Sequence, residues 1–74
     1  MGDISVEIKR RIGELSSLKG GWTRELNIVS WNGGAQKYDI RNWNPTHESK
    51  SRGITLTADE AKALYFLLKE EFDK

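Results

Sequence analysis

The chain has 74 residues, no cysteine and a formal net charge of +1 at pH 7, which predicts one small domain over residues 1–74 and excludes a disulfide framework or a thiolate metal site. A chain of this size buries only roughly 60% of its extended surface, so we expect it to gain core from a partner. No apolar run approaches the roughly 20 residues of a membrane span, and the N-terminus Met-Gly-Asp-Ile-Ser lacks the features of a signal peptide, which together favour the cytoplasm.

Residues 4–8, Ile-Ser-Val-Glu-Ile, alternate apolar and polar side chains, and Ile12 continues the same parity, which predicts a first strand. A helix is the competing interpretation, because Ile8, Ile12 and Leu15 also recur at helical spacing. Gly13 and the β-branched residues favour the strand. The apolar positions change parity toward Leu15, so we expect a bulge or bend near Gly13.

A hairpin is predicted from two alternating runs, Trp22–Trp31 and Lys37–Trp43, which flank Asn32-Gly33-Gly34. A two-residue turn would place the apolar residues of the two strands on opposite faces of the sheet. A three-residue loop with a glycine at positive φ places them on one face, so we prefer it. The pairs that it predicts are Leu26 with Ile40, Ile28 with Tyr38 and, on the other face, Glu25 with Arg41.

The polar loop 44–51 leads to a short fourth strand over Arg52–Leu56. Thr57-Ala58-Asp59-Glu60 has the pattern of a capping box and predicts the start of a helix, whose apolar stripe continues to Phe72. The expected fold is α+β, with four antiparallel strands followed by one C-terminal helix. One helix covers only one face of such a sheet, so we expect a homodimer that buries the remaining apolar surface.

The alternation places Lys37, Arg41 and Trp43 on the side of the third strand that points away from Tyr38 and Ile40. Cations for phosphates and flat aromatic rings for bases are what single-stranded nucleic acid requires of a surface. Structural packing is the alternative for Trp31 and Trp43, as core or interface packing is for Trp22. Arg41 has the alternative of pairing with Glu25 across the strands.

Charge and composition further restrict the classes of function that the sequence allows. Residues 1–56 carry nine Lys/Arg against six Asp/Glu, whereas residues 57–74 carry three against five, so the basic excess lies on the predicted sheet. His47 is the single histidine, and with no cysteine it lacks the companions of a metal site or a catalytic set. We therefore expect no enzyme activity, no metal and no cofactor.

The runs Tyr38–Trp43 (Tyr-Asp-Ile-Arg-Asn-Trp) and Arg52–Thr57 (Arg-Gly-Ile-Thr-Leu-Thr) resemble the bacterial YdbC-type proteins, relatives of the eukaryotic coactivator called positive cofactor four. Gly21–Asn27 and Val29–Gly33 extend the resemblance, which covers roughly residues 4–68. It implies a curved four-stranded sheet with one C-terminal helix, a homodimer, and sequence-tolerant binding of single-stranded DNA without catalysis.

Carried over residue by residue, the resemblance implies that the strand arginine is Arg41, the aromatic residue after it Trp43, and the basic residue before the fourth strand Arg52. The nearby Lys50 and the hairpin aromatic Trp31 are further matches. Glu25 and Asn27 stand where the eukaryotic strand is basic, which shifts phosphate contacts toward other cations. The nucleic-acid-binding residues that we predict are Arg24, Trp31, Lys37, Arg41, Trp43, Lys50 and Arg52.

The prediction is a homodimeric single-stranded DNA-binding module of the cytoplasm (nucleoid-associated if bacterial), serving transcription or DNA maintenance, with RNA as a variant ligand. The alternative is a protein-interaction module of the transcription machinery that uses exposed tryptophans as its main contacts. A salt-dependent affinity for oligonucleotides of unrelated sequence would distinguish the two.

Overall fold

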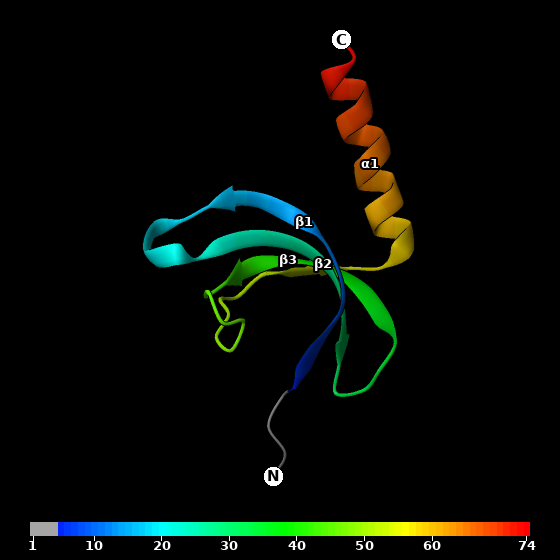
Figure 1. The fold of residues 1–74 in the computed structure, drawn as a ribbon. Coiled ribbons are helices and arrows are strands. Elements are labelled where there is room, and N and C mark those ends of the chain that lie inside the picture. The colour runs from blue at the N-terminus through cyan, green and yellow to red at the C-terminus, as the bar shows by residue number, and fades with distance from the viewer. Residues whose placement is uncertain (1–4) are drawn as a thin grey trace.

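The computed structural model describes residues 5–74, which form one antiparallel sheet and one long helix (Figure 1). Ile4 of the first predicted strand lies outside the described residues. The sheet has the order β1-β2-β3-β4, so the α+β prediction of four antiparallel strands and a C-terminal helix is confirmed. The elements are β1 (Val6–Ser17), a 3-10 turn (Lys19–Gly21), β2 (Thr23–Trp31), β3 (Gln36–Trp43), β4 (Ile54–Leu56) and α1 (Ala58–Phe72).

The β2–β3 hairpin has the predicted register. Leu26 pairs with Ile40, Ile28 with Tyr38, and Glu25 lies opposite Arg41. Asn32 and Gly33 both have positive φ, and the Gly34 amide donates to the Trp31 carbonyl at 2.8 Å. The register is the one expected for a three-residue loop and gives the two strands a common apolar face, although four residues, 32–35, separate the strands.

β1 is a strand, as predicted, but three bulges rather than one interrupt its pairing with β2. The register shifts between Ile8 and Arg10, between Arg11 and Gly13, and between Glu14 and Ser16. Each bulge inserts one extra residue and increases the local twist of the strand. Repeated along one strand, the bulges curl the sheet into the arch seen in Figure 1, and the expected curvature is confirmed.

The outer face of the sheet carries the apolar side chains of the strands, and α1 rises from this side. Thr57 caps α1 through the predicted capping box, and the helix borders a groove of about 650 Å³. Within residues 5–74 no α1 residue is buried, so the helix covers less of this face than expected. The strand residues that line the groove are Leu26, Tyr38, Ile40 and Leu56.

The inner face of the sheet, on the side opposite α1, holds the buried core. The 44–51 loop folds beneath the arch (Figure 1), and Lys50 forms an isolated bridge with Trp43. Val29 and Trp43 are the buried apolar residues of this core, with relative exposures of 0% and 3%. The buried polar and charged residues on the same face are Glu25, Asn27, Asp39 and Arg41.

The prediction that Lys37, Arg41 and Trp43 point away from the core is therefore wrong for two of the three. Lys37 is exposed, but the relative exposure of Arg41 is only 8%. Alternation assigned the faces correctly but could not show which face is covered. The loop and the curled β1 close over the polar face, whereas the apolar face stays partly open.

Candidate nucleic-acid interface

Arg41 is the centre of a fixed cluster on the inner face. Its Nε and Nη2 atoms donate to the two carboxylate oxygens of Asp39, each at 2.6 Å, in the fork geometry that makes such pairs strong. The guanidinium also lies 4.8 Å from the ring centroid of Trp31, a cation–π contact. Thr55 Oγ1 donates to Asp39 Oδ2 at 3.0 Å, so β2, β3 and β4 all contribute to holding Arg41.

Glu25, directly opposite Arg41 in the register, is the centre of a second cluster. Its carboxylate accepts hydrogen bonds from Asn27 Nδ2 and Thr23 Oγ1, and its Oε2 lies 2.8 Å from His47 Nε2. The His47 ring stacks on Trp43, with centroids 5.6 Å apart and an interplanar angle of 26°. His47 thereby ties the 44–51 loop to the underside of the sheet.

The environment of Glu25 changes its acidity. Burial on its own would raise the pKa of the carboxyl, but hydrogen bonds from Asn27, Thr23 and His47, with the charge of His47, lower the pKa below its ordinary value of 4.5. The carboxylate is therefore ionised at neutral pH. An ionised Glu25 only accepts hydrogen bonds, so His47 carries a proton on Nε2 in this contact.

The predicted pairing of Arg41 with Glu25 does not occur among the described residues, although the two lie directly opposite each other. Each finds another partner, because Asp39 is adjacent to Arg41 on the same strand face and His47 arrives from the loop. Both charges are thus compensated inside the fold. Arg41 is already bound to a carboxylate and is not a free phosphate ligand in this structure.

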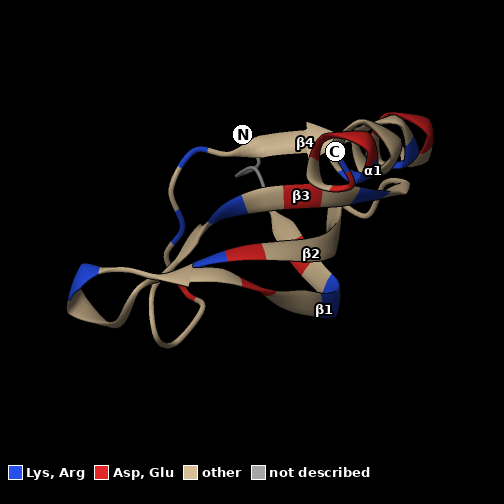
Figure 2. Ribbon diagram, turned by 90° about the horizontal axis from the view of Figure 1, so that it is seen from above, with Lys and Arg blue, Asp and Glu red and all other residues tan. Residues whose placement is uncertain are grey.

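The other predicted cations lie around the rim of the sheet and are exposed. Lys37 pairs with Val29 in the register and lies on the inner-face side, and Lys50 Nζ is 6.0 Å from the Trp43 ring centroid. Arg24 lies on the opposite face of β2, where its Nε donates to Asn42 Oδ1 at 3.0 Å. Figure 2 shows Lys and Arg along the strands and in the connection from β3 to β4, where Lys50 and Arg52 lie.

The structure therefore brings four of the seven predicted residues together in two pairs, Arg41 with Trp31 and Lys50 with Trp43, and Lys37 lies on the same face of the sheet. Arg24 and Arg52 lie apart from this group. Sequence reasoning missed His47 and Arg11. His47 reaches Glu25 through a loop whose path has no periodic signal, and Arg11 faces inward only because a bulge shifts β1 by one residue.

The arrangement offers cations, aromatic rings and hydrogen-bond donors. Residues 5–74 contain no group of three or more side chains that could hold a metal ion. In the same described range, no helix is long and apolar enough to cross a membrane. What the site can do chemically is bind an anionic, partly aromatic ligand.

Comparison with known proteins supports this reading. The family described as Transcriptional Coactivator p15 (PC4) matches residues 18–65, more than half of the chain. An "Uncharacterized protein" of Treponema pallidum (strain Nichols) is 46% identical over 66 residues, which cover 89% of this chain and 78% of that protein. The family is known for single-stranded DNA binding and a coactivator role, and its domain is not an enzyme. The chain belongs to the PC4 family and is similar to a bacterial member of it.

Proposed function

We propose that this protein binds single-stranded DNA with little dependence on base sequence, through the inner face and rim of its sheet. The observation that carries the proposal is the position of Trp31. Its ring is only partly buried and the Arg41 guanidinium lies over it, which orients the indole as a platform. Stacking on such a platform contributes about 1–3 kcal/mol per base.

The phosphates of the bound strand contact the exposed cations Lys37 and Lys50 on the inner-face side, and Arg24 and Arg52, which lie apart from them, contact phosphates only where the strand runs past the rim of the sheet. Arg41 and Trp43 serve this interface from within: Arg41 orients Trp31, and Trp43 supports the loop that carries Lys50. The structural basis for this division is burial, because both side chains are more than nine-tenths covered. RNA offers the same phosphates and bases, and we propose DNA because the family is known for it.

We further propose that the functional unit is a homodimer, and that it acts in the cytoplasm. Support for the dimer comes from the large apolar side chains that α1 exposes on its groove side and beyond. Apolar patches of this kind mark protein interfaces. A second copy seated against α1 would bury the outer face and leave the inner face free for DNA.

The test is a tryptophan-fluorescence titration of the full chain with unstructured single-stranded and duplex oligonucleotides at two salt concentrations. We expect quenching by the single strand and weak binding of the duplex. The logarithm of affinity should fall with the logarithm of salt concentration by about 0.7 per phosphate contact. Trp31→Ala should weaken binding about 5- to 150-fold, the equivalent of one lost stack.

A folded protein that responds to neither oligonucleotide would contradict the proposal and favour the protein-interaction module. Equal affinity for duplex and single strand would contradict the stacking part. Trp43→Ala is not a suitable probe of stacking, because Trp43 is 3% exposed and its loss opens the core.

A further inference from the structure

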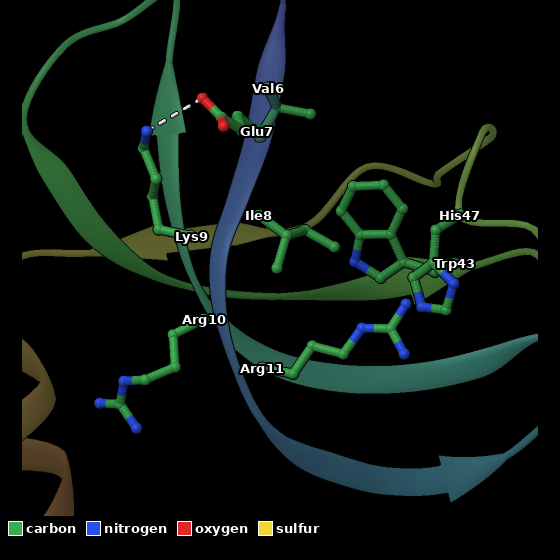
Figure 3. Close-up of a pocket in the computed structure, with 8 residues that line it drawn as sticks. All are labelled: Val6, Glu7, Ile8, Lys9, Arg10, Arg11, Trp43 and His47. Carbon is green, nitrogen blue, oxygen red and sulfur yellow. Dashed lines mark ion pairs between the residues drawn. The ribbon is translucent and has the colours of Figure 1, made fainter.

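A hollow of about 510 Å³ lies on the inner side of the sheet, between β1 and the 44–51 loop. Figure 3 shows Val6, Ile8 and Arg11 of β1 on one side of it, and Trp43 and His47 on the other. The volume is in the range of small-ligand pockets, roughly 300–1,000 Å³. β1 precedes the segment that matches the PC4 family, residues 18–65.

Arg11 faces the hollow because of the first bulge in β1. Ile8 pairs with Val29 and Arg10 with Ile28, so Arg11 comes opposite the inner-face residue Asn27. In Figure 3 the Arg11 guanidinium extends toward His47 and Trp43, whereas Arg10 extends to the other side of the strand. Within residues 5–74 no carboxylate forms an ion pair with Arg11.

The Trp43 indole supplies the second feature. Its Nε1–H is buried and has no hydrogen-bond partner among residues 5–74. It lies in the wall of the hollow, on the side of the ring that faces Ile8 (Figure 3). Buried donors are almost always paired, so an unpaired one requires an explanation such as a ligand. The hollow thus combines apolar contact from Val6 and Ile8, one unused donor and one unpaired cation.

We propose that this hollow holds one nucleotide of the bound single strand, a subsite that rests on the proposed DNA binding. The base packs on Val6 and Ile8, and one of its acceptor atoms receives the hydrogen bond from Trp43 Nε1. Ile8 shifts to let the base reach this buried donor. Arg11 neutralises the phosphate of the same nucleotide. A free anion would leave the apolar wall unused, and an apolar ligand would leave both Arg11 and the indole N–H unpaired.

A matched pair of arginine variants tests whether Arg11 binds a phosphate of the single strand. Arg11→Ala and Arg10→Ala remove neighbouring arginines that point to opposite sides of β1, each in the full chain. With an oligothymidine ligand we expect Arg11→Ala to reduce the steepness of the log–log salt dependence by about 0.7 and Arg10→Ala to leave it unchanged. If both variants change the slope equally, or neither does, the subsite is wrong while the proposed function stands.

The indole N–H resonances of the ¹⁵N-labelled protein test the donor, with Trp43→Phe used to assign the Trp43 signal. On titration with oligothymidine, the Trp43 signal should move downfield as its N–H gains an acceptor, and the Trp31 signal should move because of stacking. A saturable shift of Trp31 with a stationary Trp43 would overturn the subsite and keep the proposed function. If no oligonucleotide binds at all, the proposed function itself fails.

Discussion

At the scale of single residues, the charged side chains at the centre of the inner face are buried inside the fold and are not exposed to solvent. Asp39 and Glu25 are both almost fully buried, and each is paired, Asp39 with the Arg41 guanidinium and Glu25 with the His47 imidazole. Removing one member of such a pair leaves an uncompensated buried charge, which costs far more than the pair contributes. Substitutions here should therefore affect stability before they affect binding.

Replacing Arg41 with Ala should lower the free energy of unfolding by about 3–5 kcal/mol, because Asp39 would remain buried without its partner. Chemical denaturation of the purified variant measures this change. Lys37→Ala is the matched control, since Lys37 is an exposed cation of the same strand face, and it should change stability by less than about 0.5 kcal/mol. Similar stabilities for the two variants would mean that the Asp39–Arg41 pair contributes little to the fold.

Glu25 should make the stability of the fold depend on pH in the acidic range. Its pKa is lowered in the folded state below the ordinary 4.5, so the ionised carboxylate stabilises the fold above that value. The contribution is lost as pH falls from about 4.5 through the lower folded pKa. Melting temperatures of the wild type and Glu25→Gln, compared between about pH 3 and 7, should show a smaller acid loss in the variant. Glu70→Gln, on exposed α1 surface, should retain the full loss.

At the scale of elements, the turn into β4 determines how the third and fourth strands meet. A Cβ atom at Gly53 would overlap the Ile40 carbonyl oxygen and Arg41 Cβ, and would lie 3.1 Å from Arg41 Cα. These are backbone or near-backbone atoms that cannot move aside. β4 can therefore approach β3 at this point only with glycine in position 53.

Gly53→Ala should destabilise the protein by about 1–3 kcal/mol, the usual cost of forcing extra volume into a packed site. Gly13→Ala is the control, because nothing lies within 4 Å of a Cβ atom at Gly13. Thermal unfolding of the two variants gives the comparison. An unchanged melting temperature for Gly53→Ala would show that β4 can separate from β3 without loss.

The elements also show which parts of the fold could be predicted from the sequence and which could not. Local signals sufficed for the hairpin register and for the helix start, because alternation, the Asn-Gly loop and the capping box each act over a few residues. The bulges of β1 were predicted only in part, since the extra residues Lys9, Ile12 and Leu15 do not differ in type from their paired neighbours. The burial of Arg41 and Trp43 depends on the path of the 44–51 loop, which no periodicity encodes.

At the scale of the whole molecule, α1 and the outer face leave a large apolar surface without a partner in residues 5–74. Leu67, Tyr65 and Phe72 are 66%, 57% and 79% exposed, and Leu64 and Leu68 line the groove beside the strands. A small domain with this much exposed apolar surface gains stability by association. The dimer that we propose would use the outer face, opposite the face assigned to DNA.

Sedimentation equilibrium should give twice the chain mass of 8.5 kDa. Leu68→Glu, placed in the groove, should shift the protein toward monomer because the interface would bury a charge. Glu70→Lys, an exposed residue on another side of α1, should leave the mass unchanged. A monomeric wild type at micromolar concentration would contradict the dimer, and circular dichroism of each variant shows whether α1 is retained.

The bulges of β1 have one more consequence, which concerns solubility. β1 is an edge of the sheet, 12 residues long, and a regular edge of that length is a template for aggregation with other strands. Here the ladder is interrupted at every third residue between Ile8 and Ser16, and Lys9, Arg10 and Arg11 add like charge. A second chain could continue the sheet for only a few residues before losing register. The same irregularity that curls the sheet thus removes the regular edge on which a second chain could pair.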